Sequence, residues 1–319
     1  MKKLSTSKKY NPAKSRHAGP GVSVVLVSHN TADLTKKSIN SIIKSSNYSE
    51  ELIEIILVDN NSTDQTVSVI KKLFPEVKVV VNQKNLGFGA GNNVGVNVSH
   101  GEYVLLLNTD AFLSPDTLPT LISRLSADSS LLAVSPILVY EDSGIQQSVG
   151  YFPTPNRVTA WMWGLDKIPV IKTLFPEPYH FFDTTLYNQD LSADWLMGAV
   201  VLLRRNEYLS VGGFDEDYFM YGEEVELFYR LRRKYPTKKS SLISSVQATH
   251  LGSASTKKTS AHRLTQELRG IEYFYHKHLP HLYWYIKLVI TIGVLIRLLI
   301  FSFIPARRET LVEYRNYFS

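Results

Sequence analysis

Short apolar runs alternate with amphipathic segments over roughly the first 125 residues of the chain. Continuous apolar runs of this kind are typical of strands that are covered on both faces of a sheet. The predicted strands are Val22–Val27, Ile53–Val58, Val77–Val81 and Tyr103–Leu107. The predicted helices between and after them are Thr31–Ile43, Thr63–Leu73, Ala90–Val98 and a segment that opens at Pro115. This alternation predicts an α/β fold with a mostly parallel sheet and right-handed crossovers.

The pattern changes after about residue 130. Leu131–Val139 and Trp195–Arg204 are again strand-like, and Leu227–Lys234 is helical in pattern. Residues 150–190 are rich in proline and aromatic side chains and show no clear period. An irregular segment of that length predicts a functional loop region over a cleft. The final block, from about Ser260, is basic and aromatic and ends in a long apolar stretch.

The positive charge of the chain is concentrated in its first twenty residues. The net charge is +6, and residues 1–20 contain six basic residues and no acidic one. This segment is polar and lacks a hydrophobic run, which predicts a disordered tail and excludes a signal peptide. Because Tyr10 is its only aromatic residue, a lipid partner or no partner is favoured over nucleic acid. We therefore expect a tail over 1–20, a catalytic domain over 21–259 and a helical, membrane-associating region over 260–319.

Composition excludes several kinds of site. There is no cysteine, so disulfides, thiolate zinc sites and cysteine nucleophiles are absent. The hydrophobic fraction of 44% and the charged fraction of 20% are those of a globular chain.

Polar residues follow three of the predicted strands. Ligands of an open parallel sheet bind beyond the carboxyl ends of its strands. The first strand ends in Ser28-His29-Asn30, the second in Asp59-Asn60-Asn61 and the fourth in Asn108-Thr109-Asp110. Each of these alone is more often a turn or a helix cap. Together they line one edge with donors and acceptors, which suits a sugar nucleotide.

The glycine cluster Gly87-Phe88-Gly89-Ala90-Gly91 is not a dinucleotide fingerprint, because its spacing is off and the first strand lacks a glycine turn. It indicates instead a helix that backbone or ligand approaches closely. Asn85, Asn92 and Asn93 stand beside it as possible hydrogen-bonding groups.

Two residues are candidate ligands of a divalent cation. Asp110, together with diphosphate oxygens and water, suits Mg²⁺ or Mn²⁺. His250 ends a weak strand pattern and precedes a loop of small residues. A lone histidine is more often structural, so its position after a strand is the argument for a role at the site.

An acidic and aromatic stretch runs from Phe214 to Leu227. Glu223 and Glu224 stand where its helix begins, and the helix dipole alone would favour carboxylates there. The neighbouring Phe219 and Tyr221 would exclude water from the pair, and that environment turns a carboxylate into a general base.

These segments, in this order, resemble the family 2 glycosyltransferases of the GT-A fold, in the branch of the bacterial rhamnosyltransferases. The resemblance spans residues 22–253. It is carried by these segments: Val24–Asn30, Leu57–Asp64, Asn85–Asn93, Leu106–Asp110, Asp194–Ala199 and Gly212–Leu227.

The resemblance implies a Rossmann-like sheet flanked by helices and a role for each motif. Glu224 would be the catalytic base with Glu223 beside it, and Asp59 would accept from the nucleobase. Asp110 and His250 would hold Mg²⁺ or Mn²⁺. The residues expected to bind the nucleotide sugar are Ser28, Asn30, Asp59, Asn61, Asn85, Gly87, Asn93, Asn108 and Asp110. Those expected to bind the acceptor are Trp195, Asp215 and Tyr221.

Three positions depart from the family pattern. Asn108 replaces the first acid of the metal motif, so the metal would rest on Asp110. Glu224 stands where aspartate is usual, which moves the carboxylate by roughly 1 Å. His29 stands where the family often has an aromatic residue.

The implied activity is inverting transfer of a sugar from a nucleotide-diphosphate donor, with dTDP-rhamnose as the first candidate. The acceptor would be a hydroxyl of a lipid-linked cell-surface glycan. A sugar-phosphate nucleotidyltransferase is one alternative, although Ser28–Leu34 lacks the basic glycine-rich loop which that activity needs. A catalytically inactive scaffold of the same fold is the other.

The apolar stretch Ile286–Ile304 is just long enough to span a bilayer. Its polar residues Lys287, Thr291, Arg297 and Ser302 share one helical face, which favours a helix that lies in the membrane interface. A buried core helix is the alternative. We expect the protein at the cytoplasmic face of a bacterial inner membrane, as a peripheral or monotopic protein.

Overall fold

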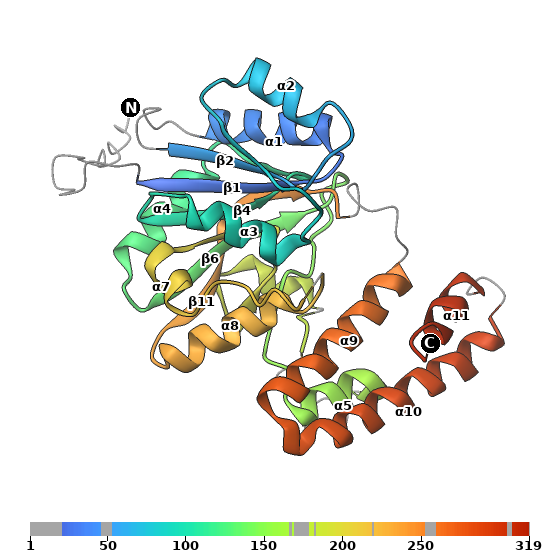
Figure 1. Cartoon of the computed structure of the whole chain (residues 1–319). Coiled ribbons are helices and arrows are strands. Elements are labelled where there is room, and N and C mark those ends of the chain that lie inside the picture. Colours follow the sequence, from blue (N-terminus) through green and yellow to red (C-terminus); the bar gives the residue numbers. More distant parts are fainter. Residues whose placement is uncertain are drawn as a thin grey trace, which may run out of the picture.

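The computed structural model describes residues 21–45, 53–165, 168, 179–181, 183–218, 220–252, 260–304 and 308–318 (Figure 1). The predicted tail over residues 1–20 and the predicted water-excluding side chain of Phe219 lie outside the described residues.

A twisted sheet forms the centre of the structure. Its order is β3-β2-β1-β4-β10-β6-β11-β5, with β8 paired to β11. The strands of the first half are parallel neighbours, as the alternation of strands and helices predicts. Their bounds are β1 Val22–Ser28, β2 Ile53–Asp59, β3 Lys78–Val81 and β4 Tyr103–Asn108.

The second half of the sheet is mixed. There β10 runs antiparallel to both β4 and β6, and β6 and β11 are parallel. The strands β5 and β8 are antiparallel to β11. The bounds are β5 Ala111–Leu113, β6 Leu131–Val139, β8 Leu191–Ala193, β10 Val200–Arg204 and β11 Lys239–His250. A mostly parallel sheet therefore describes the first half of the sheet better than the second half.

The predicted strand Trp195–Arg204 is two strands. The first is β9 (Trp195–Leu196), which pairs with β7 (Val149–Gly150) in a separate small sheet. The second is β10, which joins the main sheet. Gly198 lies in the break, and a Cβ there would lie 2.8 Å from Phe88 and 3.0 Å from a carboxylate oxygen of Glu224. The strand is interrupted where other parts of the site pack closely against its backbone.

Helices cover both faces of the sheet. The alternation of side chains along β1 separates two cores: Val24 and Leu26 pack with Ile39, whereas Val25 packs with Val96. The helices concerned are α1 Ala32–Ser45, α2 Thr66–Leu73, α3 Phe88–Asn97, α4 Thr117–Ala127, α7 Arg205–Ser210 and α8 Glu223–Lys234.

The region expected to be irregular contains a helix, α5 (Pro155–Trp163). Pro155 occupies its first turn, where the missing N–H costs nothing, and Gly164 closes it in a left-handed conformation with φ 68°. A 3₁₀ turn follows at Thr184–Asn188. The helix is short and its pattern is masked by aromatic residues, which is why the sequence period does not reveal it.

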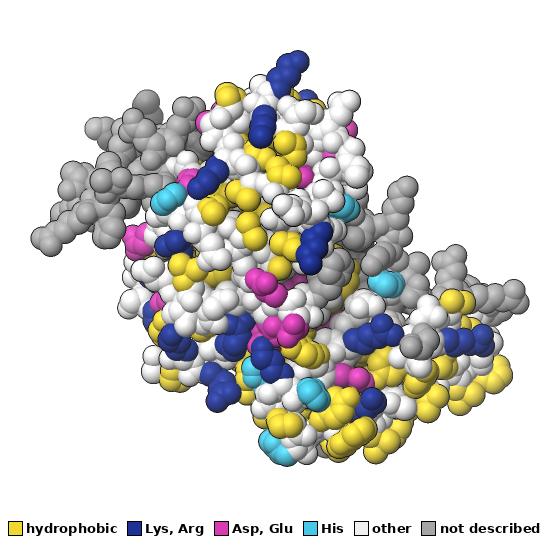
Figure 2. Space-filling model, viewed as in Figure 1, with side chains coloured by type: hydrophobic (Ala, Val, Ile, Leu, Met, Phe, Trp, Pro, Cys, Tyr) yellow, Lys and Arg dark blue, Asp and Glu magenta, His cyan; other side chains and the backbone are white. Residues whose placement is uncertain are grey.

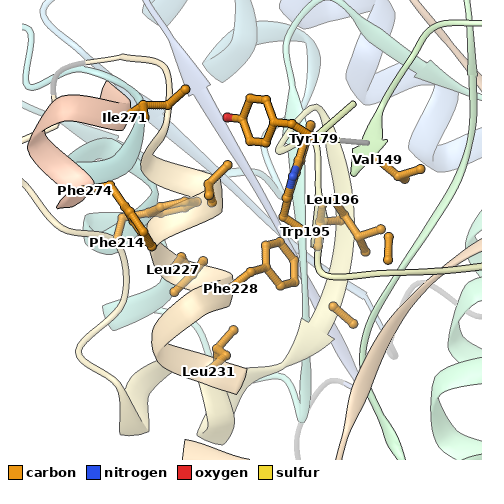
Figure 3. Packing of buried hydrophobic residues seen from close by; sticks show 14 of the residues in the cluster. Val149, Tyr179, Trp195, Leu196, Phe214, Leu227, Phe228, Leu231, Ile271 and Phe274 are labelled. Carbon is orange, nitrogen blue, oxygen red and sulfur yellow. The ribbon is translucent and has the colours of Figure 1, made fainter. Parts of the chain in front are cut away.

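The C-terminal region is helical, as predicted. It contains α9 (Ser260–His278), a 3₁₀ turn (Pro280–Leu282), α10 (Tyr283–Ser302) and α11 (Arg308–Arg315). The mid-chain helix α5 lies between α9 and α10 (Figure 1). Ile271 and Phe274 of α9 belong to the same hydrophobic cluster as Phe214 and Leu227 (Figure 3). The C-terminal helices therefore share a core with the sheet domain.

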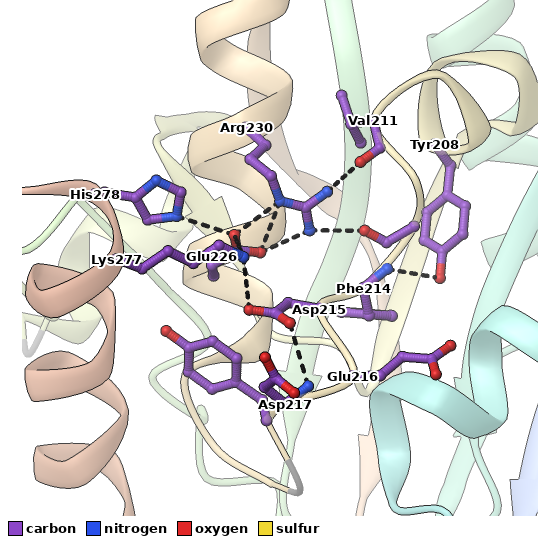
Figure 4. A network of polar contacts seen from close by, with 12 residues as sticks. Tyr208, Val211, Phe214, Asp215, Glu216, Asp217, Glu226, Arg230, Lys277 and His278 are labelled. Atoms are coloured by element: carbon purple, nitrogen blue, oxygen red, sulfur yellow. Dashed lines mark hydrogen bonds and ion pairs between the residues drawn. The ribbon is translucent and has the colours of Figure 1, made fainter.

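A buried carboxylate ties α8 to α9. Glu226 has no exposed surface, and its oxygens accept hydrogen bonds from Arg230, from Lys277 at 3.1 Å and from His278 at 3.0 Å (Figure 4). Arg230 Nη2 also donates to the carbonyl of Gly213 at 2.7 Å. The hydrogen bonds and the cations lower the pKa of Glu226 to about 2 despite its burial, which acts in the opposite direction.

We expect Glu226→Gln to destabilise the fold by about 1.5–3 kcal/mol, because the buried side chain loses charge-assisted hydrogen bonds from Arg230, Lys277 and His278. The depressed pKa gives the sign of the pH dependence. The carboxylate contributes its full stability above about pH 4.5 and loses it as the pH falls toward about 2.

Chemical denaturation of the wild type and the variant between pH 2 and 7 measures both effects. Glu76→Gln, at an exposed carboxylate, is the matched control and should change little. Equal stability of Glu226→Gln and the control at pH 7 would refute the role of this carboxylate.

Candidate active site

A cavity of about 650 Å³ opens beyond the carboxyl ends of β1 and β4. It continues between the loop before α3 and the first turn of α8. Many of the residues proposed from the sequence line it: Ser28, Asn85, Gly87, Asn108, Asp110, Trp195, Tyr221, Glu223, Glu224 and His250. Asn30, Asp59, Asn61, Asn93 and Asp215 do not line it.

The end of β1 contributes a hydroxyl and an imidazole. The Ser28 hydroxyl is buried and lies 2.9 Å from that of Thr31, which belongs to a hydroxyl chain reaching Thr109. His29 donates through Nδ1 to the carbonyl of Asn60 at 2.8 Å, so its ring is held against the end of β2. The imidazole that replaces the family's aromatic residue is thus anchored at the wall of the cavity.

Asp59 lies behind the cavity wall with one oxygen unpaired. Its side chain is 1% exposed, and Oδ2 accepts from the backbone N–H of Ser62 at 2.9 Å. Among the described residues no hydrogen-bond donor reaches Oδ1. A buried carboxylate oxygen without a donor is costly, so this atom is a candidate acceptor for a ligand N–H.

Asn30 and Asn61 shape the loops that follow β1 and β2. Both have left-handed backbones, with φ 56° and 60°, a conformation that asparagine tolerates better than most residues. Oδ1 of Asn30 accepts from the backbone N–H of Thr63 at 2.7 Å and from that of Asp64 at 3.2 Å. Asn61 is exposed. In this structure Asn30 therefore holds one loop against the other.

Asn85 and Gly87 form the turn that leads into α3. Oδ1 of Asn85 accepts from the N–H of Gly87 at 3.0 Å, and Gly87 has φ 85°. Asn60 at the end of β2 donates to the carbonyl of Gly87 at 2.9 Å. The turn is thereby fixed to the sheet edge, and both residues face the cavity.

Asn93 uses all of its hydrogen-bonding capacity inside the protein. Its Nδ2 donates to the carbonyl of Phe214 at 2.9 Å and to Glu216 at 3.0 Å. Its Oδ1 accepts from the Phe214 N–H at 2.8 Å and from the Tyr208 hydroxyl. The amide holds the start of the acidic stretch, which we call the acidic loop, against α3. All of its donors and acceptors are used there, so none remains to bind a ligand.

Asp110 and His250 meet at the far end of the cavity. The antiparallel pairing of β5 with β11 places His250 opposite Ala111, and the N–H of Leu251 donates to the carbonyl of Asp110 at 3.0 Å. His250 Nε2 lies 3.4 Å from Asp110 Oδ1, and both side chains are buried. In the part of the chain that the structure describes, no group of three His, Cys, Asp or Glu residues converges on one point.

This pair fits a divalent cation. A carboxylate oxygen and an imidazole nitrogen suit Mn²⁺ or Mg²⁺ when diphosphate oxygens and water complete the shell. Two ligand atoms at right angles on such an ion are about 3 Å apart, close to the separation seen here. Asn108, in place of the first acid, lies beside them at the cavity wall.

The two acids of α8 occupy the opposite wall. Glu223 is 2% exposed, and Oε2 finds no donor among the described residues. Burial raises the pKa of Glu223 well above its ordinary value, and the adjacent Glu224 raises it further. Burial also raises the pKa of Glu224, although the backbone N–H groups of Glu224 and Gly198 oppose the shift.

The backbone that presents these acids is strained. Tyr221 has φ 73° and Gly222 has φ 95°, immediately before α8 begins at Glu223. A left-handed non-glycine residue costs free energy and is retained where the surroundings fix it. Here the Gly198 N–H donates to Oε1 of Glu224 at 3.1 Å and fixes that side chain.

Of the three residues predicted to bind the acceptor, two line the cavity and one lies outside it. Trp195 and Tyr221 line the cavity, and the Trp195 indole N–H donates to the carbonyl of Tyr151 at 3.1 Å. Asp215 lies outside it, where Lys277 donates to its Oδ2 at 2.7 Å.

Several cavity residues carry no signal in the sequence. Glu267 of α9 faces the acids of α8 across the cavity and accepts from His180 at 2.7 Å. His180 contacts Trp195 edge to face. Gln146 lies against His250. Gln146 and His180 lie in irregular loops, and Glu267 lies on a helix more than thirty positions beyond the acidic stretch. No local sequence motif therefore identifies them.

Comparison with known proteins agrees with this geometry. The model of the family described as Glycosyl transferase family 2 matches residues 23–195, more than half of the chain. The chain is 27% identical over 223 residues to rhamnosyltransferase WbbL of Escherichia coli, covering 66% of this chain and 76% of that protein.

A second relative comes from Mycobacterium tuberculosis. The chain is 29% identical over 201 residues to its N-acetylglucosaminyl-diphospho-decaprenol L-rhamnosyltransferase. The match covers 57% of this chain and 62% of that protein, less than two thirds of its length.

Solved structures establish the fold. The mannosyltransferase PcManGT of Pyrobaculum calidifontis, in complex with GDP-Man and Mn²⁺, superposes with a TM-score of 0.55 and 16% identity, over 93% of this chain and 74% of that one. GalNAc-T7 with UDP, GalNAc and Mn²⁺ superposes with a TM-score of 0.54 and 18% identity, over 80% of this chain and 50% of that one. The sheet has the GT-A arrangement, and the chain belongs to glycosyl transferase family 2.

Proposed function

We propose that this glycosyltransferase transfers a sugar with inversion from a nucleotide-diphosphate donor to a hydroxyl of a lipid-linked glycan. L-rhamnose from dTDP-rhamnose is the first candidate, supported by the two rhamnosyltransferases to which the chain is similar. One observation carries the proposal: a cation-binding pair, Asp110 and His250, and a buried acid pair, Glu223 and Glu224, line the same cavity.

The donor would bind along the carboxyl edge of the parallel half of the sheet. The unpaired Oδ1 of Asp59 is an acceptor for an N–H of the nucleobase. The turn formed by Asn85 and Gly87 would face the ribose and diphosphate, with Ser28 and Asn108 beside it. Asp110 and His250 would hold a divalent cation, which supplies the positive charge that stabilises the leaving diphosphate.

Glu224 is the proposed general base. Glu223 is the deeper of the two acids, and burial together with the adjacent Glu224 raises its pKa well above the ordinary value, which favours the negative charge on Glu224 over Glu223. Glu224 takes the proton from the acceptor hydroxyl, whose oxygen then attacks the anomeric carbon opposite the leaving group. Its own raised pKa makes it a better proton acceptor near neutral pH.

The acceptor would enter from the side of α9. Trp195 and Tyr221 supply aromatic surface there, and Glu267 supplies a further hydrogen-bond acceptor. The family membership favours glycosyl transfer over nucleotidyl transfer. The inactive-scaffold alternative is tested by the turnover experiments below.

We further propose that α10 holds the enzyme on a membrane surface. Pro280–Ser302 is, in the described part of the chain, the one helix long and apolar enough to cross a membrane, and only 28% of its most apolar window is buried. Its buried face, which includes Ile286 and Ile290, packs on the protein. The outward face carries these exposed apolar residues: Trp284, Leu288, Leu295 and Leu299, with Phe303 directly after the helix. Exposed apolar side chains gather in the region of α10 in the space-filling view (Figure 2).

The structure gives Arg297 a role that the sequence did not suggest. Its guanidinium donates to the carbonyl of Met162 at 2.8 Å and to that of Trp161 at 3.2 Å, the last turn of α5. A cation at a helix C-terminus is favourable, so α5 satisfies the charge inside the protein. The outward side of α10 is therefore largely apolar, and a helix fastened to α5 in this way supports a monotopic placement over a spanning one.

We expect Glu224→Gln to lower kcat by at least ~10²-fold, because the amide cannot accept the hydroxyl proton. In the wild type, kcat should rise with pH through a pKa above 4.5, the ordinary value, because burial raises it. Steady-state turnover with dTDP-rhamnose between pH 4 and 9 measures both. Glu141→Gln, at an exposed carboxylate, is the control. Near-normal turnover of Glu224→Gln would transfer the role to Glu223.

The metal assignment predicts a loss of metal dependence. Asp110→Asn should abolish the gain in dTDP affinity that Mn²⁺ gives the wild type, whereas Asp59→Ala should weaken dTDP binding with or without Mn²⁺. Isothermal titration with and without Mn²⁺ separates the two effects, with the exposed Asp116→Asn as control. An unchanged Mn²⁺ effect in Asp110→Asn would remove this residue from the metal site.

The membrane assignment predicts that Leu288→Glu with Leu299→Glu weakens binding to anionic liposomes by at least ~10-fold, since burying each leucine is worth about 1.5–3 kcal/mol. Both side chains are exposed, so the melting temperature should not change. Leu73→Glu, on α2, is a control at another exposed leucine far from α10 (Figure 1). Liposome sedimentation that is the same for all variants would contradict the assignment.

A further inference from the structure

Gln146 makes two hydrogen bonds to the same residue, His250. It lies between β6 and β7 and is 3% exposed. Its side-chain Nε2 donates to the backbone carbonyl of His250, and its Oε1 lies 2.8 Å from His250 Nδ1. Its backbone N–H donates to the carbonyl of Leu138 at 2.8 Å. Hydrogen bonds thus fix both the backbone and the side-chain amide of Gln146.

The chemistry of these partners determines where the protons are. A backbone carbonyl only accepts, so the amide nitrogen of Gln146 must face it and the amide oxygen must face the ring. An amide oxygen also only accepts, so Nδ1 of His250 carries a proton. In the neutral imidazole Nε2 then has a lone pair and no proton.

That lone pair faces Asp110. His250 Nε2 lies 3.4 Å from Asp110 Oδ1, and the carboxylate is 2% exposed. Two acceptors held at this separation in a buried place repel each other unless a cation or a proton lies between them. The arrangement is thus prepared for a cation before the donor binds.

The loop around Gln146 is built for close contact. Gly252 has φ 65°, and a Cβ at this position would lie 3.3 Å from Nε2 of Gln146. A side chain at position 252 would therefore be strained and would press on the amide. The backbone conformation after β11 leaves Gln146 the room to reach His250.

We propose that Gln146 is a positioning residue that selects the Nδ1–H tautomer of His250 and so directs its Nε2 lone pair to the divalent cation. The inference rests on the proposed metal site. It adds a residue that touches neither the cation nor the sugar nucleotide but determines whether the imidazole can bind the cation. Hydrogen-bond partners of metal-bound histidines typically contribute a factor of about 10–100 to metal affinity.

The test is Mn²⁺ binding to the full-length protein in the presence of dTDP, followed by electron paramagnetic resonance. Gln146→Met, which keeps the size but removes both hydrogen bonds, should raise the Kd for Mn²⁺ by about 10–100-fold. Gln65→Met is the matched control, because Gln65 is exposed and does not line the cavity. Its Kd should equal that of the wild type.

A second variant separates positioning from packing. Gln146→Glu keeps an oxygen acceptor for Nδ1–H, so it should recover Mn²⁺ binding to within a few-fold of the wild type. Nitrogen-15 NMR of the metal-free imidazole should show the Nδ1–H tautomer of His250 in the wild type and in Gln146→Glu. If Gln146→Met does not fold, Mn²⁺ binding by Gln146→Glu and the tautomer of His250 test the role of Gln146.

The outcomes distinguish two failures. If the wild type does not bind Mn²⁺ with dTDP, the proposed metal site itself is wrong. If the wild type binds and Gln146→Met binds equally well, the metal site stands and the role of Gln146 is refuted. An Nε2–H tautomer of His250 in the wild type would also refute it.

Discussion

Glu226 is a carboxylate with no contact with solvent, and the arrangement of the active site depends on how it is compensated. Arg230 from its own helix and Lys277 and His278 from α9 all donate to it. Arg230 also reaches the carbonyl of Gly213, which begins the acidic loop. One buried negative charge therefore holds together α8, the loop that precedes it and α9.

This connection places α9 inside the active site. Gly270 of α9 approaches the loop so closely that a Cβ would lie 2.6 Å from the carbonyl of Tyr221. Tyr221 and Gly222 have left-handed backbones, and the packing of α9 against them helps to keep that strained turn in place. Glu267, from the same helix, faces Glu224 across the cavity. The helix that leads to the proposed membrane surface is thus also a wall of the catalytic cavity.

The sequence predicts the parallel half of the sheet and the polar residues at its edge better than the segments that close the cavity. Ser28, Asp59 and Asp110 each follow an apolar run. Parallel pairing brings the ends of such runs to one edge of the sheet, independently of the conformation of the loops. The acids of α8 were recognisable for a similar reason, since they begin a clear helical pattern. The role of Asn93 was not recognisable. Its position after a glycine cluster suggested a residue that binds the ligand, yet its amide donates to the carbonyl of Phe214, more than a hundred positions away.

The rest of the cavity and the C-terminal region depend on contacts between distant segments that have no local pattern. Helix α5 lies in a proline-rich stretch that shows no clear period. Gln146 contacts His250 across 104 positions of the sequence. Arg297 is a charge within an apolar segment, and only the structure shows that it donates to α5. The sequence groups Arg297 with Lys287, Thr291 and Ser302 on one polar face, whereas in the structure its guanidinium donates to the end of α5. Periodicity identifies a helix and its faces, whereas the neighbour of each face is a property of the tertiary structure.

The anomeric configuration of the product tests the account most directly. The enzyme would be incubated with Mn²⁺, dTDP-L-rhamnose and a polyprenyl diphosphate-linked N-acetylglucosamine acceptor, and the new linkage would be read by NMR from its one-bond carbon–proton coupling. The account predicts a glycosidic product whose anomeric configuration is opposite to that of the donor. Retention of the donor configuration would contradict the single-displacement mechanism, and hydrolysis of the donor without a glycosidic product would contradict the assignment of a lipid-linked acceptor.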